Sequence, residues 1–594
     1  MELANSEDPA HLVRAELIRE LILGRRGALD PRGIRLVGAR IVGVLDLDHV
    51  HTSTSLRLAD CTLAEPLTAY SANLSQVNLQ GSYLPGFHAD GLRVDGNLFL
   101  RGATVRGSGD RGAIRLLNAH VRGVLDCDEV EIGNNTGPAL SADRLRVDSG
   151  LFLRGATVHG SGGRGAIRLL AAHVSGPFEC DKAEINNDTA PALHADGLRV
   201  DGNLFLRGAT VRGSGDRGAI RLLNAHVRGV LDCDEVEIGN NTGPALSADR
   251  LRVDSGLFLR GATVRGSGDR GAIRLLNAHV SGQLACQRLM VGNDTGTALV
   301  SDGLRVDGNL FLRGATVRGN GDDGGICLAN AYVGGELGCQ ELVVSNTSGL
   351  MLDLGKARVE GTVFLPASVV CPDASRSGDC GHQSRVDLDG FVFTALAQVD
   401  WRQWLHLVVH HTNRYSPQPY QQLAAIERAA GHDGNVRQVL IVQQDDLRRR
   451  EPSAIGGRWA RSVHRLWGRL AGYGYRARTL ALALLLALAA AGLIGYIAGQ
   501  VPTRPGHHAA ERVPLPGNPT TAPGIQCSTI ELIGLGLDRG LPLGATGLRT
   551  KCDLDSSTFR GQGITLTIWI IQAMLWGLIT LAAAGYTNLI RKTL

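Results

Sequence analysis

The sequence has little aromatic character and little net charge. Phe, Tyr and Trp together make up 4% of its 594 residues, and the formal charge at pH 7 is only +4. The Arg residues of its central region are interleaved with Asp, so they provide no basic groove for a phosphate backbone. We therefore expect no nucleic-acid partner.

A helical apolar period is missing between Gly33 and Pro366. Short runs in this region alternate apolar and polar residues, which is the period of strands with one buried face. Clusters of Gly, Asn and Asp separate the runs and supply turns with unusual backbone angles. No cleavable secretion signal precedes the region, so we expect it to stay in the cytoplasm.

The strand pattern repeats every 53 residues. The motif V-D-G-N-L-F-L-R-G-A-T-V begins at Val94, Val200 and Val306, and the segment from Gly91 to Val158 recurs unchanged from Gly197 to Val264. A fixed period of this length is typical of a solenoid, in which each unit buries its apolar edge against its neighbours. The repeat therefore predicts a structural framework rather than a reaction.

Each unit contains two similar halves, which align on Val94, Val121 and Val147. We interpret each half as one turn of a β-helix with three short strands. The predicted fold class is therefore mainly β. It is a parallel, right-handed β-helix with turns of about 26–27 residues, followed by a small α-helical segment and two transmembrane helices.

Stacked turns place equivalent side chains about 4.8 Å apart, where like charges repel. The outward positions avoid this repulsion, because opposite charges alternate from turn to turn and His alternates with Arg. The alignment gives three such columns: Arg101, Asp128, Arg154, Asp181, Arg207, Asp234 and Arg260; Asp95, Arg122, Asp148, Ser175, Asp201, Arg228 and Asp254; and Arg93, His120, Arg146, His173, Arg199, His226, Arg252 and His279.

A fourth outward column carries a phenylalanine on every second turn, beside acidic residues such as Asp126. Its rings form the best candidate contact surface for a protein partner. In the alternative interpretation, they pack on neighbouring Arg side chains or under a loop. We call this column the phenylalanine stripe, and it comprises Phe99, Phe152, Phe205, Phe258 and Phe311.

Five glycine motifs have the form GxGxxG. A dinucleotide-binding fingerprint has a strand before it, a helix after it and an acidic residue about 20 residues further on. Here a strand pattern follows each copy, so we predict turns of the β-helix and no cofactor. The motifs begin at Gly107, Gly160, Gly213, Gly266 and Gly319, and N-x-T stretches at Asn134, Asn187, Asn240 and Asn293 are likewise predicted to be turns rather than glycosylation sites.

An inward column of cysteines occupies alternate turns. Its members are about 10 Å apart by the same spacing, which exceeds the reach of a disulfide. We predict buried free thiols that act as small apolar residues. The column comprises Cys127, Cys180, Cys233, Cys286 and Cys339, separated by Leu153, Leu206, Leu259 and Leu312.

A loop rich in Gly and Ser follows the repeats and contains Cys371, Cys380 and His382. Two thiolates and an imidazole are zinc ligands, but zinc normally takes four and no fourth is spaced for it. We therefore predict a loop without a metal. Two further pairs are predicted to lie at the surface: His410 with His411, and His507 with His508.

The repeats need a cover at their open ends. An amphipathic helix predicted from Pro9 to Gly24 can cover the first end with Leu12, Val13, Leu17, Leu21 and Ile22. Just inside that end, a short patch places Leu74, Leu79 and Leu84 five positions apart. This patch resembles the pentapeptide-repeat family and favours a coil-shaped solenoid.

Beyond the repeats, residues 415–450 predict two helices separated by Gly431. Two uncharged stretches follow, residues 479–498 and 564–586, and each is long enough to cross a hydrocarbon core of about 30 Å. The segment before the first is rich in Arg, with Trp459, Trp467, Tyr473 and Tyr475 interleaved.

The excess of Arg before the first stretch places the solenoid and the C-terminus in the cytoplasm. We therefore expect a two-span protein of the plasma membrane, whose basic segment lies near anionic lipid of the bilayer. Cys527 and Cys552 then lie in an extracytoplasmic loop, where a disulfide between them is predicted. The apolar stretch from Ile530 to Leu543 is expected to lie along the outer membrane surface.

Four segments carry a resemblance that extends over nearly the whole chain. They are L-V-R-A-E-L-I-R-E-L at Leu12, G-I-R-L-V-G-A-R-I-V-G-V-L-D-L at Gly33, Y-S-P-Q-P-Y at Tyr415 and G-Y-G-Y-R at Gly472. Together they resemble actinobacterial membrane proteins that join a cytoplasmic pentapeptide-repeat-like or β-helical region to a two-span tail. Some of these are labelled membrane-associated oxidoreductases, so the resemblance implies redox activity as an alternative.

We predict a non-catalytic, membrane-anchored scaffold that binds an unknown protein partner or copies of itself. A catalytic site needs a locally unique constellation, and repetition argues against one. We therefore assign no catalytic, cofactor-binding or metal-binding residue. The alternative is an oxidoreductase, or another β-helix enzyme, with its site outside the repeats in residues 33–88 or 367–413.

The expected organisation has nine segments. They are a capping helix in residues 1–30, the β-helix in 31–366 with double-turn repeats from about 91 to 365, an irregular connector in 367–414, the helical pair in 415–450, the basic segment in 451–478, the first span in 479–498, the extracytoplasmic loop in 499–563, the second span in 564–586 and a cytoplasmic tail in 587–594.

Overall fold

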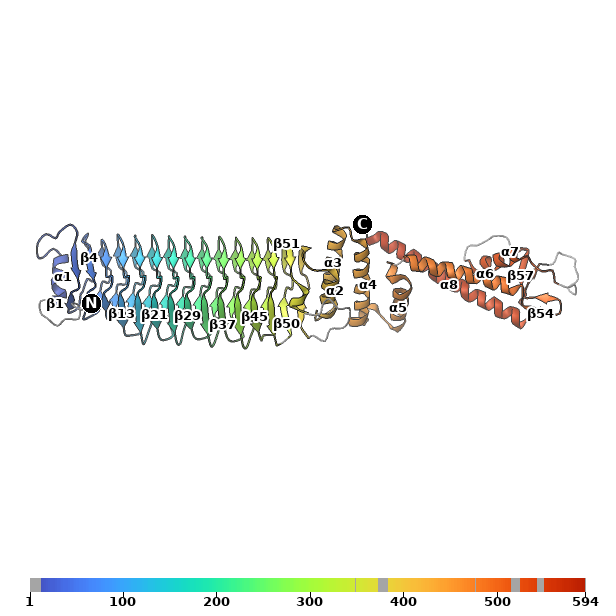
Figure 1. Ribbon diagram of the computed structural model, residues 1–594, viewed down its shortest axis with the longest axis horizontal. Helices are drawn as coiled ribbons and strands as arrows, with labels where there is room; N and C mark the ends of the chain where they lie inside the picture. Colours follow the sequence, from blue (N-terminus) through green and yellow to red (C-terminus); the bar gives the residue numbers. More distant parts are fainter. Residues whose placement is uncertain are drawn as a thin grey trace. The chain divides into compact units, whose positions relative to one another are not determined.

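The computed structural model forms two compact units, Met1–Ile426 and Glu427–Leu594. The first unit holds the solenoid and its two caps, and the second is mostly helical (Figure 1). The structure describes residues 12–347, 349–371, 383–475, 477–513, 524–541 and 550–592.

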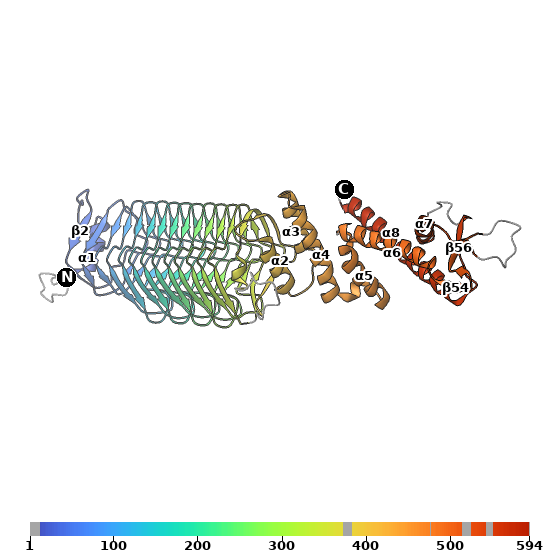
Figure 2. The same ribbon diagram turned by 45° about the vertical axis from the view of Figure 1, so that its right-hand side comes forward.

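The first unit is a parallel β-solenoid of about 13 turns, which confirms the predicted fold class. In both views the strands of successive turns stack in register along the solenoid (Figures 1 and 2). Val94 pairs with Val121, and Val121 with Val147, as the alignment of half-repeats predicts. All three side chains are fully buried, so the repeated valines form one file through the core.

Each turn has four short strands, so the prediction of three is wrong. One turn consists of β11 (Arg93–Val94), β12 (Leu98–Phe99), β13 (Thr104–Gly107) and β14 (Ile114–Arg115). The next begins at β15 (His120–Val121), which pairs with β11. Strands of two residues are too short to show a periodic alternation, and for this reason the sequence does not resolve the number of sides.

The first turns of the solenoid are shorter than the later ones. Strand β7 (Asn73–Leu74) places Asn73 opposite Arg93, whereas Arg93 in turn lies opposite His120, after a longer stretch of chain. The additional residues of the long turns form a loop between β13 and β14, and this loop contains the first GxGxxG motif. A strand follows the motif, as predicted for a turn.

Close packing at the start of this loop requires glycine. A Cβ atom on Gly107 would lie 2.6 Å from the Cα atom of Ala113, which is closer than real Cβ contacts. In the neighbouring turn Asn134 closes the corresponding loop, because its Oδ1 accepts hydrogen bonds from the backbone of Thr136 and Gly137. The prediction that N-x-T stretches are turns is confirmed at this position.

The cysteine column faces the core, as predicted. All five thiols are free and buried. Burial raises the pKa of Cys286 to about 12, and that of Cys339 to the same value. These thiols are therefore neutral at physiological pH and act as small apolar side chains.

The N-terminal cap differs from the predicted helix. Leu12–Arg14 forms strand β1, which pairs with β3 (Arg40–Val42), and helix α1 spans only Ala15–Ile22. Ile18 and Ile22 are buried, whereas Leu17 on the opposite side of α1 is 40% exposed. Pairing with an open sheet edge satisfies backbone groups that a helix would leave unpaired, so Leu12–Arg14 forms a strand within the predicted helix.

At the other end the solenoid continues beyond residue 366, so the prediction of an irregular connector is wrong. Strand β52 (Arg385–Asp387) pairs with β50 (Leu350–Asp353), and β53 (Val392–Leu396) pairs with β51 (Arg358–Phe364). Helices α2 (Trp401–His410) and α3 (Gln418–Ala429) follow. We call β52, β53, α2 and α3 together the C-terminal cap.

The C-terminal cap buries aromatic side chains. The ring centroids of Phe393 and Trp404 are 5.4 Å apart, and those of Phe391 and Phe393 are 5.0 Å apart. Tyr420 on α3 is also buried. This aromatic packing covers the last turn of the solenoid as α1 covers the first.

The second unit contains the predicted second helix of the pair and the two apolar stretches. Gly431, with φ of +78°, separates α3 from α4, which confirms the predicted break. Among the described residues of this unit, two helices are long and apolar enough to cross a membrane, over Arg478–Ala498 and Phe559–Ala583. The α-helices in its described part are α4 (Asp433–Arg450), α5 (Arg458–Ala471), α6 (Ala477–Ala498), α7 (Thr529–Gly540) and α8 (Phe559–Lys592).

Candidate functional site

The outer face of the solenoid carries the charge columns in the predicted register. Arg101 donates hydrogen bonds of 3.0 Å to Asp126 and Asp128, and Arg154 of the following turn donates to Asp128 from the other side. The Asp128 side chain is only 5% exposed. Opposite charges therefore alternate along the solenoid, and this buried carboxylate lies between two guanidinium groups.

A second network of hydrogen bonds joins the column of His and Arg residues to a neighbouring column that contains Asp148, and it repeats along the solenoid. His120 Nε2 lies 2.8 Å from Asp148 Oδ2, and Arg146 donates to Asp148 Oδ1 over the same distance. The arrangement recurs at Asp201, Asp254 and Asp307, so four equivalent copies lie along the solenoid. The hydrogen bond from His279 lowers the pKa of Asp307. Because the copies are equivalent, none is distinguished as a reactive centre, and we assign them a structural role.

The stability that such a network contributes depends on pH, as Asp196 illustrates. Burial opposes its ionisation, but hydrogen bonds from His194 and Arg221 outweigh burial and lower its pKa to about 2. The ionised form therefore contributes stability above pH 4, and this contribution is lost as the pH falls through 2.

We expect Asp196→Asn to lower the free energy of unfolding by about 2 kcal/mol at pH 7. The loss should shrink towards pH 2, because there the wild-type carboxylate is protonated too. Thermal unfolding of both proteins across this pH range measures the difference. Asp216→Asn, in an exposed loop, is the control, and an Asp196→Asn loss that is the same at both ends of the range would contradict the network.

The phenylalanine stripe lies on the outer face, and its rings are half-buried. Phe99 pairs with Asp126, and Asp126 with Phe152, as the column alignment predicts. In the described residues an Arg guanidinium lies over four of the five rings, 4.4 to 5.0 Å from the ring centroid. The alternative interpretation, that the rings pack on neighbouring Arg side chains, is confirmed at these four rings. The role of the stripe in binding a partner stays a prediction.

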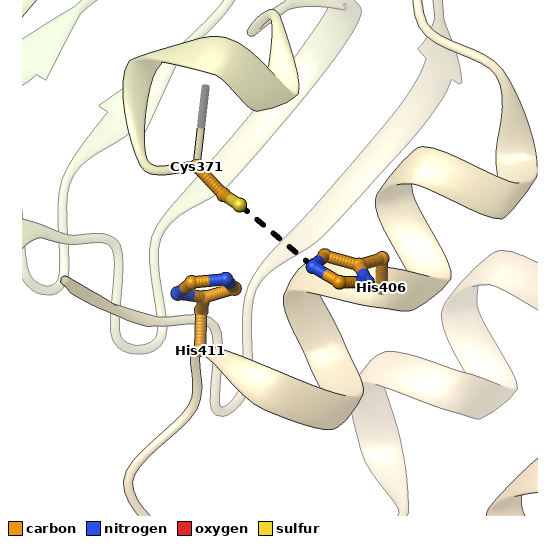
Figure 3. Close-up of side chains that lie close together, drawn as sticks. All are labelled: Cys371, His406 and His411. Atoms are coloured by element: carbon orange, nitrogen blue, oxygen red, sulfur yellow. Dashed lines mark hydrogen bonds between the residues drawn. The ribbon is translucent and has the colours of Figure 1, made fainter. Parts of the chain in front are cut away.

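The structure also brings together three residues that the sequence did not group. Cys371 follows the 3₁₀ turn Ala367–Val369, His406 lies on α2, and His411 lies at the end of α2 (Figure 3). One ligand atom from each lies within 4.8 Å of the other two. We call these three residues the Cys-His-His cluster.

The burial and grouping of these residues differ from those predicted from the sequence. His411 is fully buried, so its prediction as a surface residue is wrong; His410 is exposed, as predicted. Cys380 and His382, which the sequence grouped with Cys371, lie outside the described residues. The spacing H-x₄-H in residues 406–411 is a zinc-ligand signal that sequence reasoning missed.

Helix α5 gives the basic segment an amphipathic form. Its Arg residues lie along one face, and apolar residues lie along the other. Trp459 is 81% exposed and Leu466 is 56% exposed, so part of the apolar face is open. Trp467 packs instead against a cluster that includes Leu480 of α6 and Leu578 of α8. A helix of this kind suits the boundary between lipid and water.

The region between α6 and α8 is held by a covalent bond and by close helix packing. Cys527 and Cys552 form a disulfide. Helix α7 packs against α6 at glycine positions, where a Cβ atom on Gly495 would lie 2.7 Å from Gly536 Cα. The described part of the stretch predicted to lie along the membrane surface therefore forms helix α7, Thr529–Gly540, which packs on the first apolar helix. Its depth relative to a membrane stays a prediction.

An apolar hollow of about 680 Å³ lies between α6 and α7. Leu488, Ile533 and Leu537 are among the residues that line it, and the polar groups in its wall are those of Thr529 and Tyr496. No carboxylate, imidazole or thiol is among its described lining residues. Apart from the hydroxyl groups of Thr529 and Tyr496, the described wall of the hollow is formed by apolar side chains and backbone.

Comparison with known proteins identifies neither a family nor a function for the chain. No protein-family model, curated protein or solved structure matches the chain. The resemblance to two-span actinobacterial proteins stays a prediction.

Proposed function

We propose that the chain is a membrane-anchored scaffold. In this proposal α6 and α8 cross the plasma membrane, the solenoid and the C-terminus face the cytoplasm, and the outer surface of the solenoid binds a protein partner or further copies of the chain. The observation that carries the proposal is the periodic outer surface, on which equivalent side chains recur in register on every second turn. A surface of this kind suits an extended or repetitive partner rather than a single small substrate.

The helical unit supports the anchoring part of the proposal. Its two apolar helices have the length needed for a bilayer. Helix α5 ends shortly before α6 begins and combines Arg residues with an exposed Trp459, as interfacial helices do. The excess of Arg in the segment before α6 favours a cytoplasmic location for that segment.

Reporter fusions test this orientation. A reporter that is active only outside the cytoplasm should be inactive when fused after residue 450 or residue 594, and active when inserted between α6 and α7. Activity after residue 450 would contradict the proposed topology.

The phenylalanine stripe is the proposed contact surface. We expect the triple variant Phe99→Ser, Phe205→Ser and Phe311→Ser to lose self-association, or at least one protein captured by the wild type. The matched control changes three exposed apolar residues of another sheet to serine: Tyr83, Met290 and Val343. Sizing in detergent and quantitative capture measure both outcomes. If the stripe variant and the control retain the same partners and the same size, the stripe is not the contact surface.

An absorption spectrum of the purified chain separates the scaffold from the redox alternative. The proposal expects no flavin or haem absorption. A stoichiometric chromophore would contradict the scaffold and favour an oxidoreductase with its site outside the repeats.

A further inference from the structure

We propose that the Cys-His-His cluster binds one zinc ion, which fastens the C-terminal cap to the last turns of the solenoid. The donor set is the first reason. Thiolate and imidazole are common protein ligands of zinc, and many zinc sites combine the two. The cluster supplies them from Cys371, His406 and His411.

The distances fit a shared ion. Zinc–sulfur and zinc–nitrogen bonds of about 2.3 and 2.0 Å place two tetrahedral ligand atoms about 3.5 Å apart. Cys371 Sγ lies 3.8 Å from His406 Nε2. With the third ligand atom inside 4.8 Å of both, small side-chain rotations close the three donors around one metal. Figure 3 shows the thiol, which follows the 3₁₀ turn, close to the two rings, which come from α2 and its C-terminal end.

A backbone carbonyl orients one of the imidazoles. His411 Nδ1 lies 2.6 Å from the carbonyl oxygen of Ser384. A neutral His411 that donates its Nδ1 proton there carries its lone pair on Nε2, the other ring nitrogen. Metal-binding histidines usually have such a partner, because it fixes both the tautomer and the ring orientation. The Ser384 carbonyl can therefore hold the His411 ring in an orientation suited to metal binding.

The cluster lies where the fold needs a fastening. Cys371 follows the last long strand of the solenoid, and the two histidines lie on α2 and at its end. The backbone of His411 also accepts a hydrogen bond of 2.8 Å from the N–H of Val386 on β52. A bound zinc thus joins the end of the repeats, the entry of β52 and α2. Cys371 and His411 are fully buried, which favours a structural over a solvent-open site.

Binding has a defined proton balance. Zinc displaces the proton of the Cys371 thiol to form a zinc–thiolate bond, and the two imidazoles bind in their neutral forms. The metal stays Zn²⁺ and no electron is transferred. The three ligands found among the described residues leave a fourth position, which water or another donor fills. Affinity for zinc should fall as the pH falls, because protons compete for all three ligands.

Zinc content of the purified full chain tests the proposal. We expect about one zinc per chain after dialysis, measured by elemental mass spectrometry, if the site behaves as a structural zinc site. The variants Cys371→Ser, His406→Gln and His411→Gln should each lose most of it. Cys339→Ala, a buried solenoid thiol, and His432→Gln, an exposed histidine, are the matched controls and should retain it. Equal zinc in the cluster variants and the controls would overturn the proposal.

Two measurements on the wild type do not depend on how the variants fold. After removal of zinc, Co²⁺ should restore binding and produce thiolate-to-cobalt charge-transfer absorption. The unfolding temperature should fall on removal of zinc and recover when zinc alone is added back. A wild-type chain that takes up neither metal has a thiol–imidazole hydrogen bond only, and the proposal is then wrong. Zinc that binds without changing the unfolding temperature would overturn the fastening role.

Discussion

Val200→Lys is expected to destabilise the solenoid severely. Val200 is fully buried between Val174 and Val227 of the neighbouring turns, so the new ammonium group would enter a stacked apolar file. A lysine buried in this way has a pKa lowered by about 3–5 units. If the lysine is fully charged in the unfolded chain, this shift corresponds to about 4–7 kcal/mol of lost stability. Thermal unfolding followed by circular dichroism measures the loss.

The same residue introduced ten positions later should be tolerated. Thr210 points outward on β29 (Thr210–Gly213), between Glu184 and Glu237 of the adjacent turns. Thr210→Lys places a cation between two carboxylates, so we expect unchanged or slightly increased stability. Similar losses for Val200→Lys and Thr210→Lys would mean that the two faces of the turn are not distinguished, which would contradict the inward and outward assignment.

Gly536→Leu is expected to displace α7 from α6. A Cβ atom on Gly536 would overlap the carbonyl oxygen of Ala491, and Gly495 Cα lies only 3.0 Å from the same position. Backbone cannot yield as a flexible side chain can, so we expect a loss of at least about 3 kcal/mol, at the upper end of overpacking costs. Unfolding of the detergent-solubilised chain and protease sensitivity between α6 and α8 report the change.

Gly577→Leu is the matched control in this part of the chain. A Cβ atom on Gly577 of α8 meets nothing within 4 Å, so the larger side chain should fit without loss. If Gly536→Leu were as stable and as protease-resistant as Gly577→Leu, α7 would not pack on α6 through its glycines.

Much of the solenoid could be predicted because its information is repeated. Alternating signs at positions such as Arg154 and Asp128 identify stacked neighbours, since like charges one turn apart would repel. Repeated inward valines and cysteines report the same register independently. The sequence therefore predicted the parallel pairing, the buried thiols and the glycine turns, because each of them depends on contacts between equivalent residues of stacked turns.

Features that occur once were harder to predict. The strand at Leu12–Arg14 looks helical in sequence, and only the free edge of β3 makes it a strand. The fourth strand of each turn has two residues, too few for a period. The Cys-His-His cluster joins Cys371 to His406 and His411 across the intervening β52 and β53, and no local spacing reveals that contact. Tertiary proximity of this kind needs the fold of the C-terminal cap.

Residues one turn apart lie in a single file along the solenoid, and spin-label distances test this arrangement most directly. Glu131 and Met290 are exposed on the same sheet and are separated by six pairing steps. With labels on Glu131→Cys and Met290→Cys, and the single variants as controls, we expect a narrow distance distribution centred at about 29 Å, or six steps of about 4.8 Å. A pair two steps apart, Glu237→Cys with Met290→Cys, should give about 10 Å on the same scale. Distances that do not grow in proportion to the number of turns would contradict the solenoid register and, with it, the periodic surface on which the scaffold rests.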